Sequence, residues 1–286
     1  MNRIKTITLV RQRSCWLPFV STMELPETSA PKNRWRALLQ NWKKYLFEFL
    51  LIFLAVFLGF LPDNLREEYS EQQQANELAR SFYEELLHDS VVVAEKVKGR
   101  IKKEQAIEYM IAFFRDSSLT TSNKALAINF EWATTVRTPT LFTPRTVVLE
   151  QLKGSGALRY FKSKELQNLV GDLSVAIDYI LSRQATEAQV YHQYIEPMVV
   201  NHMDFEFQKQ LFTTGIFDRL ALYENSDEYI PFTLSQPEKV NRQAYINLLG
   251  YYHTNNIKST RLIPFKSYIE VNAALLKELR QQYKLK

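Results

Sequence analysis

The sequence feature that most constrains this chain is an unbroken apolar run at residues 45–61, YLFEFLLIFLAVFLGFL. Thirteen of its seventeen residues are Leu, Ile, Val or Phe. Each of these contributes about −0.3 to −0.6 kcal/mol to membrane insertion, whereas a charge at the bilayer centre costs about 3 kcal/mol. The only charge, Glu48, lies one turn from the edge of the run. The run therefore predicts a transmembrane helix; a buried core helix is the alternative.

Aromatic residues at the start of the run fit the same prediction. Seventeen residues span roughly 25 Å, slightly less than a hydrocarbon core of about 30 Å. A helix that begins at Trp42 would be long enough, and it would place Trp42 and Tyr45 at the interface, where amphipathic rings concentrate. Pro62 and Asp63 follow the run on the other side.

The charge distribution predicts the orientation. Nine Lys or Arg residues precede the run, against Glu24 and Glu27 only, whereas the residues from 62 onward carry 27 basic and 28 acidic side chains. The basic excess is thus confined to the N-terminal tail, which is no signature of nucleic-acid binding but does follow the positive-inside rule. We expect residues 1–44 in the cytoplasm, residues 45–61 in the bilayer, and about 225 residues exported.

The N-terminal tail predicts an uncleaved signal-anchor. Its basic region is long for a secretion signal, and no small-x-small cleavage site follows the apolar run. Residues 1–22 lack periodicity, so Met23 is a candidate for the native start. The single cysteine, Cys15, excludes an intrachain disulfide and a cysteine zinc cluster.

Residues 62–115 predict an amphipathic stalk helix that must pack on the rest of the domain or on a second copy. Gly99 is the only glycine between residue 64 and the break at Asp116-Ser117-Ser118. The predicted apolar face comprises Ala75, Leu78, Phe82, Leu86, Val93, Val97 and Ile101. The predicted polar face comprises Glu67, Glu68, Glu71, Glu77, Glu84, Glu85, Lys98, Lys102 and Lys103.

Residues 116–286 predict an all-α helical bundle that packs with the stalk. Glycines are few and alternating apolar stretches are rare, which argues against a β domain. Capping signals at Thr143-Pro144 and Ser163 mark two helix starts, and Gly154 marks a helix end. The expected helices cover residues 123–135, 145–153, 163–196, 238–252 and 265–284, with Pro197 and Pro231 bracketing a mixed, aromatic-rich region.

Two segments resemble an uncharacterised family of single-pass bacterial membrane proteins. In the first, residues 48–68, Glu48 opens an apolar run with small residues at Ala55 and Gly59, and Asn64 follows it; Leu65 stands where the family usually has Trp. The second, residues 147–170, is similar to a Leu- and Gly-spaced family pattern through Leu152, Gly156, Leu158 and Leu166. The resemblance implies an anchored domain in the bacterial cytoplasmic membrane and carries no activity with it.

The candidate site residues each have a structural alternative. Glu48 either pairs within the membrane or reaches the interface beside Lys44. Gly154-Ser155-Gly156 forms either an anion-binding nest or, more in keeping with the missing Lys-Ser/Thr, a helix C-cap and turn. The residues His192, Glu196, His202 and Asp204 form the only metal-like cluster, but their spacing matches no known geometry. A set of aromatic residues between 191 and 252 either lines a ligand pocket or forms the core.

The sequence therefore predicts a non-enzymatic scaffold or interaction module of the cell envelope. It contains no readable catalytic triad and no G-x-S-x-G motif, so we expect neither catalytic residues nor a cofactor or metal. The expected partners are the lipid bilayer and either a second copy through the stalk or another envelope protein, and not nucleic acid. Two alternatives remain open: an extracytoplasmic ligand-sensing domain, or an enzyme whose site is unrecognised.

Overall fold

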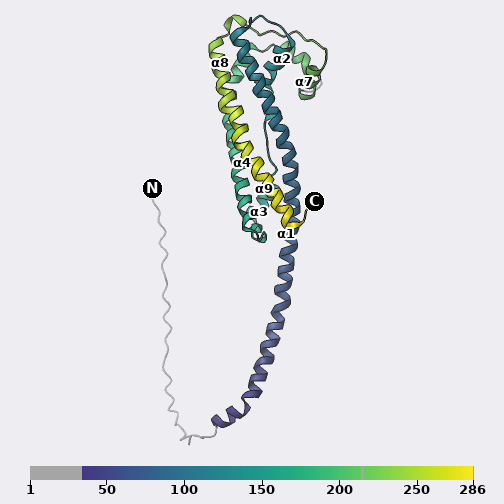
Figure 1. Cartoon of the computed structure of the whole chain (residues 1–286), viewed down its shortest axis with the longest axis vertical. Coiled ribbons are helices and arrows are strands. Elements are labelled where there is room, and N and C mark those ends of the chain that lie inside the picture. The colour runs from purple at the N-terminus through teal and green to yellow at the C-terminus, as the bar shows by residue number, and fades with distance from the viewer. Residues whose placement is uncertain (1–33, 214–215, 286) are drawn as a thin grey trace, which may run out of the picture. The chain divides into compact units, whose positions relative to one another are not determined.

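The structure is a computed structural model that describes residues 34–213 and 216–285; the side chains of residues 34–41, 60–64 and 216–218 are not described. The predicted cytoplasmic tail, including Cys15 and Met23, therefore lies almost entirely outside the described residues. The chain divides into two units, Met1–Asn64 and Leu65–Lys286. The described residues are helical or irregular and contain no strand, which confirms the all-α prediction (Figure 1).

The helices are connected by short 3₁₀ and π-helical segments and by extended loops. In chain order they are α1 (Arg34–Asp116), α2 (Lys124–Phe130), η1 (Glu131–Thr135), η2 (Thr138–Thr140), α3 (Val147–Gly154), η3 (Ala157–Tyr160), α4 (Lys164–Val190), η4 (Tyr191–Ile195), α5 (Glu196–His202), α6 (Phe205–Leu211), α7 (Ile216–Asn225), η5 (Pro237–Lys239), α8 (Arg242–Tyr251), η6 (Tyr252–Lys258), η7 (Arg261–Phe265) and α9 (Lys266–Tyr283).

The second unit is built around the long helices α1, α4 and α9, which lie side by side (Figure 1). Tyr268 of α9 donates to Asp89, and Arg280 of α9 donates to Tyr83, so α9 runs antiparallel to α1. Helix α4 runs parallel to α1, because Lys162 just before it pairs with Glu68 and Glu187 near its end pairs with Arg100.

The buried positions of α1 follow a seven-residue repeat. One row contains Ala79, Leu86, Val93, Arg100, Ile107 and Phe114, and the other contains Ala75, Phe82, Asp89, Lys103 and Met110. A repeat of 3.5 residues is the pattern of helices that pack nearly parallel in a coiled coil or bundle. The stalk's apolar stripe thus packs within its own domain, one of the two outcomes that the sequence left open.

Residues 136–148 are not helical except in η2 and at the start of α3. They run along α1 in the opposite direction (Figure 1). Val136 lies against Lys103, Pro139 against Gly99, Arg145 against Asp89, and Val148 against Glu85. We call residues 136–148 the descending segment. It fills the space that a fourth helix fills in many bundles, and its Phe142 packs against Phe265 and Tyr268 of the η7–α9 region.

Several predicted helix boundaries are shifted. The helix expected to start after Thr143-Pro144 begins at Val147, with Thr146 at the N-cap position. The helix expected from residue 238 begins at Arg242, because Asn241 caps its amide groups. Pro197 does not end a helix: α4, η4 and α5 follow one another without a break, and Pro197 lies within this helix, just after the π-helical turn η4.

Candidate functional site

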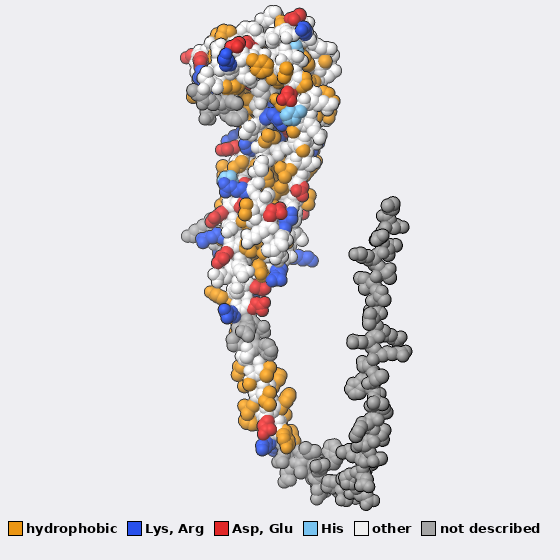
Figure 2. All heavy atoms as spheres, turned by 180° about the vertical axis from the view of Figure 1, so that it is seen from behind, with side chains coloured by type: hydrophobic (Ala, Val, Ile, Leu, Met, Phe, Trp, Pro, Cys, Tyr) orange, Lys and Arg blue, Asp and Glu red, His pale blue; other side chains and the backbone are white. Residues whose placement is uncertain are grey.

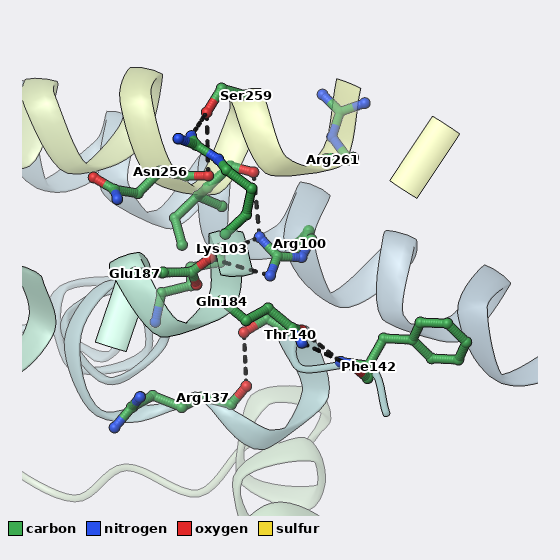
Figure 3. A network of polar contacts seen from close by, with 12 residues as sticks. Arg100, Lys103, Arg137, Thr140, Phe142, Gln184, Glu187, Asn256, Ser259 and Arg261 are labelled. Carbon is green, nitrogen blue, oxygen red and sulfur yellow. Dashed lines mark hydrogen bonds and ion pairs between the residues drawn. The ribbon is translucent and has the colours of Figure 1, made fainter. Parts of the chain in front are cut away.

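A layer of buried charged residues separates two hydrophobic cores in the second unit, and we call it the charged layer. It comprises the buried Arg100 and Lys103 of α1 and Glu187 of α4. The partly buried Arg137 and the backbone carbonyl of Val136, both in the descending segment, lie beside them. Along α1, one core extends to Val97 and the other begins at Ala106. Along α4, the same cores are separated between Ile180 and Val190. The layer therefore crosses the bundle at one level (Figure 3).

Arg100 is fully buried, at 0 % exposure, and its guanidinium group has several partners. Both Nη atoms lie 3.1 Å from Oε2 of Glu187, and Nη1 also donates to the carbonyl oxygen of Ile257 at 3.3 Å (Figure 3). Its Cζ atom lies 4.6 Å from the centre of the Phe265 ring, a cation–π distance. Its Nε atom has no partner among the described residues.

Lys103 is equally buried and has a weaker set of partners. Its Nζ atom donates to the carbonyl oxygen of Val136 at 2.8 Å and lies 5.7 Å from the centre of the Tyr252 ring. Burial lowers the pKa of Lys103 to about 7; Glu187 opposes this effect, while Arg137 and Arg100 add to it. A single carboxylate thus faces several cations, and Lys103 is the cation that can give up its proton near neutral pH.

Polar side chains of α1 and α4 also bind the backbone of the descending segment. Lys103 binds the carbonyl of Val136, and Lys96 binds that of Thr138 at 3.1 Å. The Gln184 side chain accepts from the N–H of Phe142 at 2.7 Å and donates to its carbonyl at 2.9 Å. Buried backbone groups without a helix or sheet partner need such side chains, so the layer compensates for an extended segment inside a helical bundle.

Two carboxylates continue this role nearer the start of the unit. Asp89 accepts from the N–H of Arg145 at 2.9 Å and from the Tyr268 hydroxyl at 3.1 Å. Glu85 accepts from the N–H of Val148 at 3.2 Å, at the start of α3, where a negative charge favours the helix. Burial raises the pKa of Glu85 against these hydrogen bonds.

Glu131, in η1, is another fully buried ionisable group. It accepts from the Thr135 hydroxyl and from Nε2 of Gln208 at 3.5 Å. Burial raises the pKa of Glu131 to about 7. Among the described residues there are four π-helical segments, η1, η4, η6 and η7. The rings of Tyr191 (η4), Tyr252 (η6) and Phe265 (η7) lie against Arg137, Lys103 and Arg100, respectively.

The structure corrects the predicted polar face of the stalk. Glu85 and Lys103 were expected on that face but are buried, whereas Ile101 was expected on the apolar face and is 38 % exposed. The core-facing positions of α1 keep to spacings of three and four in alternation past Val93, through the partly buried Lys96 and the buried Arg100 and Lys103. The predicted face instead followed Val97, which packs partly buried against one core, to Ile101, which lies outside the buried rows.

The four residues of the metal-like cluster have separate structural roles. The exposed His192 pairs with Glu196, Nδ1 to Oε2 at 2.9 Å, whereas His202 is buried with its ring nitrogens against the Ser235 carbonyl and the Tyr245 hydroxyl. Asp204 caps α6 by accepting from the N–H groups of Glu206 and Phe207. Within the part of the chain that the structure describes, no group of three potential ligands could hold a metal ion.

The residues of the second family-like segment have structural positions. Leu152 and Leu166 are fully buried in one core, and Leu158 packs against it partly buried. Gly156 follows α3 in the left-handed region, at φ +69°, so a residue without a side chain suits this turn. Gly154-Ser155-Gly156 therefore ends α3 and begins η3.

The aromatic-rich region forms mainly core. Phe207, Tyr223, Phe232 and Tyr252 are buried, and Tyr191 is nearly so. Phe212 and Tyr245 are partly buried, and the side chain of Phe217 lies outside those described. The exposed members are Tyr194, Phe205, Tyr229 and Tyr251.

The predicted anchor residues lie in the first unit, which is described here by itself. Every described side chain from Trp42 to Gly59 is exposed, including Tyr45, Glu48 and Ala55 (Figure 2). The apolar ones cover all sides of the helix; Phe49 is 65 % and Ile52 is 67 % exposed. Phe60, Leu61 and Asn64 lie outside the described side chains. A search of the described helices found none with the length and apolar character needed to cross a membrane.

Comparisons with models of known protein families, with curated proteins and with solved structures found no match for this chain. The resemblance carried by Leu152, Gly156, Leu158 and Leu166 accordingly stays a prediction.

Proposed function

We propose that the chain is a single-pass protein of the bacterial cytoplasmic membrane whose second unit acts as a non-enzymatic interaction module of the cell envelope. The observation that carries the proposal is the exposure of apolar side chains on all sides of α1 between Tyr45 and Leu58. A docked protein covers one face of a helix, whereas lipid covers every face, so a bilayer is the environment that suits this surface.

The energetics of transfer support an anchor that extends to Leu61. Thirteen large apolar residues contribute about −4 to −8 kcal/mol, which exceeds the cost of about 3 kcal/mol for one carboxylate. Glu48 lies in the first turn of the run, near Lys44, so its carboxylate can reach the interface while its methylene groups stay among the lipid tails. The excess of basic residues before the apolar run supports an N-terminus in the cytoplasm and residues 62–286 outside it.

The chemistry of the buried polar groups supports an interaction module rather than an enzyme. The backbone of the descending segment is hydrogen-bonded to the side chains of Glu85, Asp89, Gln184 and Lys103. Arg100 and Glu187 are bound to each other and are shielded from solvent. A catalytic group must reach a substrate, whereas these groups stabilise a packed interior.

Membrane association is tested by alkaline extraction of membranes from cells that express the full chain. We expect the native chain to stay in the membrane pellet and a Leu51→Arg/Leu54→Arg variant to be released, because two central arginines cost about 5–7 kcal/mol. The matched control is Val175→Arg/Leu222→Arg, at exposed apolar positions of α4 and α7, which should stay in the pellet. Release of the native chain would contradict the anchor.

Orientation is tested by protease treatment of intact spheroplasts that carry a C-terminal tag. Digestion of the tag from outside is the expected result. Protection until lysis would place the second unit in the cytoplasm and would remove the envelope role, while leaving the anchor itself in place.

A further inference from the structure

A polar groove opens between α1, α3 and η3 in the second unit. Its volume is about 420 Å³, within the range of small-molecule sites. Its lining residues are Gln74, Glu77, Leu78 and Ser81 of α1, together with Gln151, Ser155, Ala157 and Tyr160.

The lining is dominated by neutral groups that both donate and accept hydrogen bonds. Gln74 and Gln151 provide amides, and Ser81 and Tyr160 provide hydroxyls; the Ser155 hydroxyl can only accept, because it already donates its proton to the Gln151 carbonyl. The only charge is Glu77, and one of its oxygens already accepts from Nε2 of Gln73 at 3.1 Å. A single carboxylate repels an anionic ligand and attracts a cationic ligand only weakly. The groove therefore fits a neutral ligand rich in hydroxyl or amide groups.

One wall of the groove is fixed by local structure. The Ser155 hydroxyl donates to the carbonyl of Gln151 at 2.6 Å and accepts from the N–H of Ala157 at 3.3 Å. Gly156 makes the left-handed turn between them, and Ala157 is anchored in the core. This arrangement holds Ser155 and Tyr160 in place before any ligand arrives, which lowers the entropic cost of binding.

Tyr160 adds an aromatic ring to these polar groups. It is half-buried, its hydroxyl accepts from Nη2 of Arg159 at 3.4 Å, and the rest of the wall consists of amides and hydroxyls. A sugar ring combines hydroxyl groups with a C–H face that packs on aromatic rings. We propose that this groove binds a neutral oligosaccharide, which rests on the proposed function because it names the envelope component that the module contacts.

The test is calorimetric titration of the purified full chain with the trimer of N-acetylglucosamine, in a zwitterionic detergent without a sugar headgroup. We expect saturable binding that weakens about five- to tenfold in Gln74→Ala and in Gln151→Ala, because each loses a hydrogen bond to the ligand. Tyr160→Leu should weaken binding more than Tyr160→Phe, which keeps the ring.

Control variants come from the neighbouring groove, on the other side of Glu77. Asn76→Ala and Arg80→Ala lie in a separate groove and should leave the affinity unchanged. The proposal is overturned if the folded chain shows no saturable binding, or if Gln74→Ala and Gln151→Ala bind the trimer with the affinity of the native chain. The titration uses purified protein and does not depend on membrane orientation. A negative titration therefore leaves the extraction and spheroplast results valid, and negative extraction or spheroplast results leave the titration interpretable.

Discussion

Arg100 and Glu187 form a buried ion pair whose members cannot be removed singly without cost. Deleting one partner of such a pair leaves an uncompensated charge and costs about 3–5 kcal/mol, whereas replacing both by apolar residues costs far less. We therefore expect Arg100→Met and Glu187→Met each to lower the unfolding temperature strongly, and the double variant to lower it less than the two single changes combined.

Thermal unfolding of the full chain in detergent, followed by circular dichroism at about pH 8, checks this prediction, because Lys103 is then mostly neutral. Glu196→Gln is the matched control: it removes an exposed carboxylate beside His192 and should change stability by less than about 0.5 kcal/mol. Additive effects of Arg100→Met and Glu187→Met would show that the two side chains do not stabilise each other.

Lys103 and Glu131 predict an unusual dependence of stability on pH. The folded-state pKa of Glu131 is raised from 4.5 to about 7. Its contribution to the free energy of unfolding is therefore fully present below pH 4.5 and is lost as the pH rises through 7. Lys103 has a pKa lowered from 10.5 to about 7, so its contribution is full above pH 10.5 and is lost as the pH falls through 7. Both groups therefore destabilise the fold most near neutral pH.

Urea unfolding across this pH range measures the effect, with upper limits of about 3 kcal/mol for Glu131 and about 5 kcal/mol for Lys103. Glu131→Gln should flatten the profile below pH 7 and Lys103→Met should flatten it above pH 7. A native profile with its maximum at neutral pH, unchanged in both variants, would contradict the assignment of these groups.

At the level of elements, Gly99 fixes the approach of the descending segment to α1. A Cβ atom at Gly99 would lie 2.4 Å from the carbonyl oxygen of Pro139, which is backbone and cannot rotate away. We expect Gly99→Ala to destabilise the fold by about 1–3 kcal/mol, although alanine is the better helix former. The same change at Gly171 of α4 meets no atom within 4 Å and should stabilise by about 0.5–1 kcal/mol. Chemical denaturation of both variants compares the two, and stabilisation by Gly99→Ala would exclude the close contact.

Much of the helical pattern was predictable because local signals and structure agree. Ser163 caps α4 as expected, since its side chain accepts from the amide three residues on, and Asn123, where a helix was expected to begin, caps α2 in the same way. The break after Asp116 and the end of α3 at Gly154 were also readable. Helix starts after residues 143 and 238 were placed too early, because a cap is effective only where the chain geometry permits it.

The charged layer was not predictable from apolar periodicity, since its core positions hold Lys and Arg. Such residues are almost never buried without partners, and the partners here are Glu187 and backbone carbonyls distant in sequence. A seven-residue repeat extended through Ala79, Leu86 and Val93 to Arg100, Ile107 and Phe114 is the signal that would have revealed it. The two grooves beside Glu77 leave no comparable trace in the sequence.

At the scale of the whole molecule, the second unit contains both hydrophobic cores, from Ala79 to Leu279. We therefore predict that a fragment lacking residues 1–62 is soluble and helical, since no part of its core is removed. Circular dichroism and size-exclusion chromatography check this prediction. A disordered fragment would mean that the first unit is required for folding.

The charged layer also divides the second unit into two regions that need not open together. Apolar contacts couple the residues within each core. Between the two cores, at Arg100 and Glu187, the helices are connected by hydrogen bonds and an ion pair, which water can replace when the bundle opens. In native-state hydrogen exchange, we expect the amides of α1 around Phe82 and those around Met110 to fall into separate classes of protection. A bundle that looks continuous along α1 would then behave as two cooperative folding units stacked end to end.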